Sequence, residues 1–225
     1  MHKLFVFAAV LFLSAVTQTQ SPVQEVADEK EPELRVELVK MGIADQNMRG
    51  EFDRFRRAKG LFVDNKTLNE MFDKDPVLKK EFLDVANRMT DLDKVHSARL
   101  KEIVTKYGWP GRTLVGTEAA ASAWLMLQHA DYDVAFQRMC LELIKKMPPC
   151  EVENSQFAEL TDRVLLNEGK KQLYGTMPVR TKDGTLVPKP IEDEANVDKR
   201  RAELGLQPLA EYMRRLARNA GIVRN

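Results

Sequence analysis

Hydrophobic residues in this chain of 225 residues recur mainly every three or four positions, which is the spacing of helices with one buried face. The most apolar stretch, residues 119–127 (AAASAWLML), follows a Gly108-Trp109-Pro110 turn and has no polar face. A helix that is apolar all round is buried, so we expect this one at the centre of the fold. Its polar end, Gln128-His129-Ala130-Asp131, then needs polar partners from other segments.

Amphipathic stripes on both sides of this segment predict helices that surround it. The first begins near Leu34 and ends before Gly60, and the region Leu61–Asp75 is expected to be a short connection. Asp75-Pro76 is a typical helix start, and the stripe that follows, as far as Tyr107, fits one long helix or two that break near residues 90–93. Further helices are expected at 132–147, with Asp131 as cap and Met139 facing inward, and at 154–168, 192–204 and from 208 onward.

The spacing changes to period two after Gly169. Leu173, Met177 and Val179 alternate with polar residues, and Lys182-Asp183-Gly184-Thr185 is a strong hairpin-turn signal. We therefore predict a mainly α fold, a compact helical domain around a central buried helix, with one small β-hairpin near residues 171–191. A single domain is expected over residues 34–225.

The first 20 residues have the order of a secretory signal peptide. His2 and Lys3 precede the apolar run Leu4–Leu13, and small or polar residues follow. The run is shorter than the roughly 20 residues of a membrane helix, although an uncleaved anchor is the alternative. Residues 21–33 are polar and acidic and are expected to form a flexible leader. The sequence thus predicts a secreted or periplasmic protein without a stable membrane span after signal cleavage.

The charge balance and the cysteine count limit the classes of function that the chain can have. With 35 basic and 34 acidic residues and no basic tract, the chain is a poor candidate for nucleic-acid binding. An unknown small molecule or an envelope component is the expected partner, and no cofactor can be named. Two cysteines are too few for a disulfide scaffold, but Cys140 and Cys150 could form one disulfide in an exported protein, or Cys140 could be a small core residue.

His129 is the candidate catalytic residue. An imidazole beside carboxylates can be oriented for acid/base work, and Asp131 or Asp162 would orient it here. On a continuing helix, Asp133 and Ser122 would share the face of His129. The alternatives are one arm of a metal site, or a histidine that bonds backbone carbonyls at a helix end. No zinc-binding or nucleophile motif is found, and no metal is predicted.

The candidate ligand-binding residues share polar character and come from several predicted helices and from the segment before the hairpin. Arg49 or Arg163 would bind an anionic or carbonyl group, and the backbone around Tyr174 would line a pocket. The set consists of Gln46, Arg49, Gln128, Arg163, Tyr174, Gly175 and Thr176. Asp45 and Arg49, four residues apart, are expected to pair at the surface, and His96 to be a satisfied core histidine.

Short polar motifs occur in a fixed order: Asp45-Gln46-x-x-Arg49, Gly108-Trp109-Pro110, Gln128-His129-Ala130-Asp131, Leu160-x-Asp162-Arg163, Gln172-x-Tyr174-Gly175-Thr176 and Val197-Asp198-x-Arg200-Arg201. In this order they resemble an uncharacterised bacterial family, domain of unknown function 6624, over about Leu38–Tyr212. Met177 and His96 depart from the residues that the family favours. The resemblance implies the fold and the grouping of these motifs, and no reaction.

Two functions fit these observations. The first is an exported, hydrolase-like enzyme with a polar site around His129, Asp162-Arg163 and Tyr174–Thr176. The second is a non-catalytic binding or interaction module of the cell envelope, in which the same residues form a buried structural network. Both predict that the motifs meet in space, because the end of a buried helix needs polar partners.

Overall fold

The computed structural model describes residues 30–181 and 184–219, so the predicted signal peptide and nearly all of the leader lie outside the described residues. The fold is mainly α with one two-stranded antiparallel sheet, as the sequence predicts. No helix within the described ranges is long and apolar enough to cross a membrane. The described chain divides into two compact units, one up to Leu160 and one from Thr161, and each is described by itself.

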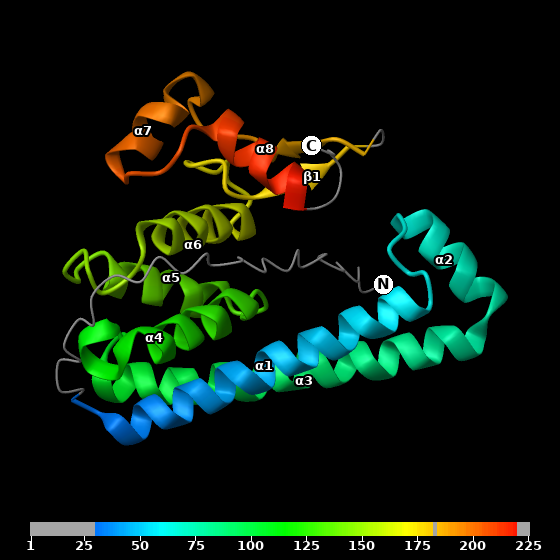
Figure 1. The fold of residues 1–225 in the computed structure, drawn as a ribbon, viewed down its shortest axis with the longest axis horizontal. Coiled ribbons are helices and arrows are strands. Elements are labelled where there is room, and N and C mark those ends of the chain that lie inside the picture. The colour runs from blue at the N-terminus through cyan, green and yellow to red at the C-terminus, as the bar shows by residue number, and fades with distance from the viewer. Residues whose placement is uncertain (1–29, 182–183, 220–225) are drawn as a thin grey trace. The chain divides into compact units, whose positions relative to one another are not determined.

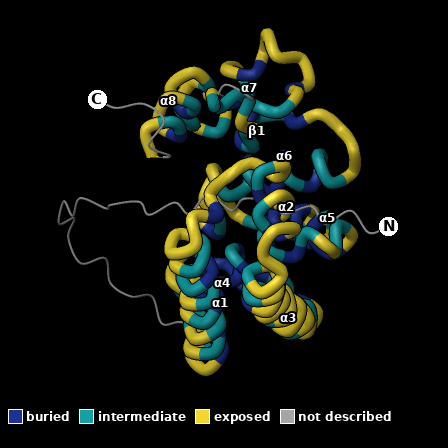
Figure 2. Tube along the Cα trace, turned by 90° about the vertical axis from the view of Figure 1, so that its right-hand side faces the viewer, coloured by how far each residue is buried: buried dark blue, intermediate teal, exposed yellow. Residues whose placement is uncertain are grey.

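The first unit is helical throughout. It contains α1 (Pro32–Ala58), α2 (Asn65–Lys74), α3 (Pro76–Tyr107), α4 (Arg112–His129), α5 (Val134–Ile144) and the beginning of α6 (Asn154–Asn167). In Figure 1, α3 runs back alongside α1, and both helices contact α4. In Figure 2, buried residues gather where α4 meets α1 and α3, while the outer faces of α1 and α3 are exposed.

The α3 helix settles the choice between one helix and two. It is continuous over 32 residues, and the Asp75 side chain caps it by accepting a hydrogen bond from the Leu78 backbone N–H. The predicted connection Leu61–Asp75 was wrong, because α2 occupies most of it. Asp64 caps α2, and Leu68 and Phe72 lie one turn apart on the face that packs into the core.

The α4 helix is buried as its composition predicts, and Ala119, Ala123 and Leu127 have no exposed surface. Small residues allow α1 to approach it closely. A Cβ atom built on Gly42 of α1 would overlap the Ser122 hydroxyl and lie 2.7 Å from the Ser122 Cβ atom. Larger residues at these two positions would therefore separate the helices that carry the site described below.

The turn after α4 differs from the prediction. The helix ends at His129, and α5 begins at Val134 with Asp133, not Asp131, as its cap; Asp133 accepts from the Phe136 backbone N–H. Met139, expected to face inward, is 45% exposed, because the buried face of α5 is formed by Phe136, Gln137, Cys140, Leu141 and Ile144. The two cysteines are free thiols: Cys140 is buried in α5, and Cys150 is exposed.

The second unit contains the remainder of α6, the hairpin strands β1 (Pro178–Arg180) and β2 (Leu186–Pro188), the 3-10 turn η1 (Glu194–Asn196), α7 (Val197–Glu203) and α8 (Leu209–Asn219). The strands pair antiparallel, with Val179 opposite Val187. Residues 173–177, which the period-two pattern extended into the strand, form an irregular loop. Asp162 binds the backbone N–H groups of this loop and so draws them away from strand pairing.

Candidate functional site

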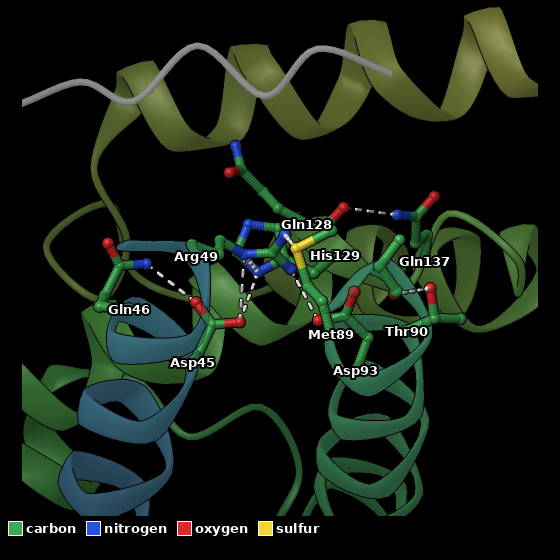
Figure 3. A network of polar contacts seen from close by, with 10 residues as sticks. Asp45, Gln46, Arg49, Met89, Thr90, Asp93, Gln128, His129 and Gln137 are labelled. Atoms are coloured by element: carbon green, nitrogen blue, oxygen red, sulfur yellow. Dashed lines mark hydrogen bonds and ion pairs between the residues drawn. The ribbon is translucent and has the colours of Figure 1, made fainter. Parts of the chain in front are cut away.

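Four ionisable side chains from three helices meet in the first unit. We call Asp45 and Arg49 of α1, Asp93 of α3 and His129 of α4 the charged cluster (Figure 3). His129 Nδ1 lies 2.8 Å from Asp45 Oδ1, and Arg49 Nε lies 3.1 Å from His129 Nδ1. The Arg49 guanidinium also contacts Asp93 Oδ1 at 2.6 Å. The arginine is therefore the centre of the cluster.

The position of each residue on its helix explains why it reaches the cluster. Asp45 and Arg49 are one turn apart on the buried face of α1, and His129 is the last residue of α4, so its ring stands at the helix end. Asp45 is 2% exposed and Arg49 9%. The expectation of a surface ion pair was therefore wrong, because the face of α1 that carries this pair packs against α3 and α4.

The protonation of the His129 ring follows from its two neighbours at Nδ1. This nitrogen can donate to the Asp45 carboxylate or accept from Arg49 Nε–H, but not both. The contact with Asp45 is the shorter one, and a bond to a carboxylate is the stronger kind. We therefore assign the proton to Nδ1, where it is donated to Asp45. Nε2 then carries the lone pair and is the nitrogen that can accept a proton.

The pKa values of the two carboxylates in the cluster are shifted in opposite directions. Burial alone would raise the pKa of Asp45, but the hydrogen bond from His129 and the positive charge of Arg49 outweigh it, so this pKa lies below its usual value. Burial raises the pKa of Asp93, and Arg49 only partly offsets this effect. Asp45 is thus the carboxylate that the fold stabilises in its charged form.

The residues that sequence proximity assigned to His129 have other partners. The Asp131 carboxylate accepts from the Gln137 side chain at 3.1 Å, and Asp133 pairs with Lys101 of α3. Asp133 cannot share a helix face with His129 because α4 has already ended. The orienting carboxylate in the structure is Asp45, which lies 84 positions away in sequence.

Two candidate ligand-binding glutamines lie beside the cluster. Gln46 donates to Asp45 Oδ2 at 2.8 Å, and Gln128 donates to Glu159 at 3.2 Å. Gln46 also lines a groove of about 300 Å³ between α1 and α4, together with Val39, Gly42, Ile43, Asn47, Glu118, Ser122 and Leu125. Gln46, which donates to Asp45, is the lining residue that connects this groove to the charged cluster, and His129 is not among the residues that line it.

Sequence reasoning missed Asp93 and misjudged His96. Met89, Asp93, His96 and Leu100 follow one another by one helical turn along α3, and this spacing could have placed Asp93 on the inner face. His96 is 6% exposed, and its Nδ1 has no hydrogen-bond partner in the part of the chain that the structure describes. It is thus buried as expected but not satisfied. Burial lowers its pKa, against the attraction of Asp45, so the ring is neutral at neutral pH.

A second polar group forms in the unit that begins at Thr161. Asp162 accepts from the backbone N–H groups of Leu173, Tyr174 and Thr176 at 2.7–2.9 Å and from the Thr176 hydroxyl at 2.8 Å. Burial raises the pKa of Asp162, and these four donors act in the opposite direction. The carboxylate therefore fixes the course of the loop that leads into β1.

Side chains of α7 and α8 also bond the backbone of this loop. The buried Arg201 donates to the Tyr174 carbonyl at 2.6 Å, and the Tyr212 hydroxyl donates to the Thr176 carbonyl at 3.0 Å. Gly175 has a φ of 71°, and a Cβ atom there would lie 2.7 Å from Leu209 Cδ1. Arg163 follows Asp162 on α6 and is half-buried.

The structure therefore brings the predicted motifs together in two groups. Asp45, Gln46, Arg49 and His129 meet in the first unit, and Asp162, Tyr174, Gly175 and Thr176 meet in the second. One site that joins both groups stays a prediction.

A family model matches residues 73–224 of the chain. The chain belongs to the family of unknown function DUF6624. No curated protein and no solved structure gives a significant match. The resemblance inferred from the ordered polar motifs is thereby confirmed, and the DUF6624 family supplies no reaction for the site.

The residues matched by the DUF6624 family model include only part of the charged cluster. Asp93 and His129 lie inside the matched residues, whereas Asp45 and Arg49, on α1, precede them. One ligand atom from each of Asp45, Asp93 and His129 lies within 4.8 Å of the others, a spacing that a metal ion could bridge. Arg49, however, contacts all three groups and supplies the positive charge between them. The cluster is therefore held together by the His129–Asp45 hydrogen bond and by the ion pairs of Arg49 with both aspartates.

Proposed function

We propose that this DUF6624 protein is an exported enzyme of the hydrolytic type, in which His129 transfers protons and Asp45 orients it. The observation that carries the proposal is the 2.8 Å contact between Nδ1 of the partly exposed His129 and Oδ1 of the buried Asp45. A carboxylate that holds one imidazole nitrogen leaves the other free to accept a proton from water or from a substrate hydroxyl. The hydrogen bond from His129 and the charge of Arg49 together lower the pKa of Asp45, and the ionised carboxylate keeps the ring in this tautomer.

The groove beside Gln46 is the proposed place for the substrate. Its volume of about 300 Å³ suits a small molecule. Apolar residues form one part of its lining and Gln46 with Glu118 another, so it suits a substrate with both an apolar and a polar portion. The substrate is thus proposed to be a small molecule, not a polymer.

A hydrolysis screen with general chromogenic substrates tests the proposal. The wild-type chain is assayed against chromogenic carboxylic esters, phosphate esters and amides, beside His129→Ala and Asp45→Asn. Loss of general acid–base catalysis should lower the rate by about 10²–10⁴-fold in His129→Ala. Asp131→Asn is the matched control, because Asp131 is close to His129 in sequence but bonds Gln137. Equal rates in wild type and His129→Ala would exclude His129 as the acid–base group.

The second candidate function is a non-catalytic binding or interaction module of the cell envelope. The contacts of Asp162 favour this module. In the hydrogen bonds given for it, this buried carboxylate accepts from backbone N–H groups and one hydroxyl of the loop before β1, which is a structural role. If His129 has the same structural role, His129→Ala should cost about 1–3 kcal/mol of stability. If it is catalytic, the loss should be smaller, because functional groups are often kept at the expense of stability. No hydrolysis together with a large loss of stability would favour the module.

A further inference from the structure

A basic and aromatic surface lies at the end of α1, outside the charged cluster. Residues 54–63 (RFRRAKGLFV) contain four basic side chains and no acidic one. Phe62 and Val63, in the connection to α2, are 54% and 37% exposed. We call the surface of this segment the basic–aromatic patch; it consists of the exposed Arg54, Arg57, Lys59, Phe62 and Val63 and of Arg56, which is half-buried and donates to the Leu61 carbonyl.

The residues on either side of Phe62 and Val63 fix this link so that both side chains are exposed to solvent. The preceding Leu61 is fully buried, and its N–H donates to the Arg56 carbonyl at 2.8 Å. The following Asp64 caps α2 through the Lys66 and Thr67 backbone N–H groups. Two consecutive apolar residues between these fixed points cannot turn into the core together. Their exposure is therefore built into the fold.

Cations flank the exposed ring. The guanidinium carbon of Arg56 lies 4.2 Å from the centroid of Phe62, and that of Arg57 lies 5.7 Å from it. Lys59 is engaged with Glu81 at 2.8 Å, and the acidic residues Asp53 and Asp64 border the segment. Four basic side chains thus face three acidic ones, Asp53, Asp64 and Glu81, so the patch keeps a small positive excess, and this excess lies on its arginines.

We propose that the basic–aromatic patch docks the protein on an anionic phospholipid surface. Arginines beside an exposed aromatic ring suit a bilayer interface, where the guanidinium groups bind lipid phosphates and the ring enters the boundary of the acyl chains. Nucleic acid would also attract the arginines, but the adjacent Val63 offers nothing to a base or a phosphate. The proposal does not depend on the proposed hydrolysis.

Vesicle sedimentation tests the proposal with the full chain. Phosphatidylcholine vesicles with and without 30% phosphatidylglycerol are compared at low and high salt. Wild type should bind the anionic vesicles more strongly, and this difference should fall at high salt. Arg57→Glu should weaken binding to anionic vesicles by about 25-fold, since it changes the charge by two units and each unit near such a surface contributes about fivefold. Phe62→Ser should weaken binding to both kinds of vesicle.

The apolar N-terminal run of the full chain could itself bind vesicles, so matched controls are needed. Arg214→Glu removes an exposed arginine of α8, and Val95→Ser removes an apolar residue of α3 that is 64% exposed. Both controls should bind as wild type does, and circular dichroism confirms that all variants fold. If Arg57→Glu and Phe62→Ser bind as well as their controls, the patch does not dock the protein. Binding of the patch to soluble polyglutamate but not to vesicles would instead assign it to an acidic protein partner.

Discussion

The two aspartates that contact Arg49 should differ in how much stability is lost when their charge is removed. In Asp45→Asn the amide would lose the ion pair with Arg49, and its nitrogen would face Gln46 or His129, which donate to the carboxylate in wild type. Removing bonds to a buried charged group should cost about 1.5–3 kcal/mol of unfolding free energy at pH 7. In Asp93→Asn the cost should stay below about 1 kcal/mol, because burial already favours the neutral form of this side chain.

The pH dependence has opposite signs for the same reason. The pKa of Asp45 is lowered in the fold, so its stabilising effect is present above the unfolded pKa of about 3.9 and is lost as the pH falls through the folded value. The pKa of Asp93 is raised, so its ionisation destabilises the fold, and wild type regains this free energy as the pH falls through the folded value. The unfolding free energy of Asp93→Asn should therefore lie closest to that of wild type near neutral pH and fall further below it at acidic pH.

Urea unfolding monitored by tryptophan fluorescence measures both variants. The two tryptophans of the chain, Trp109 and Trp124, are buried in the same unit as the charged cluster. Their signal therefore reports the unfolding of that unit. An Asp93→Asn variant that loses as much stability at pH 7 as Asp45→Asn would refute the assignment of Asp45 as the ionised partner of His129.

Three further predictions concern packing, the second unit and the compartment. Gly42→Ala should cost about 1–3 kcal/mol through overlap with Ser122, and adding Ser122→Gly should recover part of this loss in the same urea assay; no recovery would mean that the close approach of the helices is not the cause. Asp162→Asn should accelerate hydrogen exchange at the Thr176 amide, whose acceptor is the carboxylate; unchanged protection there would contradict the role of Asp162 in the loop. Mass spectrometry of the exported protein should show a chain that begins near residues 16–21, whereas an intact Met1 in the cytoplasm would contradict export.

The sequence predicted the helices well wherever a stripe ran for several turns. The apolar face of α3 continues from Leu78 to Val104, and that length identified the segment as helical but left open whether it was one helix or two. The shorter α2 was missed because its ten residues carry only two buried positions, Leu68 and Phe72. The strand predicted to begin near Leu173 starts later because a side chain from α6 captures the backbone before it, and periodicity contains no information on such a tertiary contact.

The sequence identified His129 but not its partner. Carboxylates close in sequence were the natural candidates, yet α4 ends at His129 and the chain turns away, so Asp131 and Asp133 bond elsewhere. Asp45 comes from a helix that is distant in sequence, and only the packing of α1 against α4 brings it to the ring. The i, i+4 pair of Asp45 and Arg49 was recognisable, but its burial was not, because charged residues are rarely expected on a core-facing stripe.

The contrast between the two polar groups indicates where chemistry is to be sought. Asp162 and Arg201 bond backbone groups of an irregular loop, and these groups would otherwise be buried without partners. The helices that carry the charged cluster already satisfy their own backbone, so Asp45 and Arg49 instead bond side chains of neighbouring helices. Apolar residues could fill that space at a lower cost of desolvation. Asp45 and Arg49 are buried charges that no backbone group requires, and we propose that they are there to orient and polarise His129. For this reason we propose the charged cluster, and not the loop, as the catalytic centre.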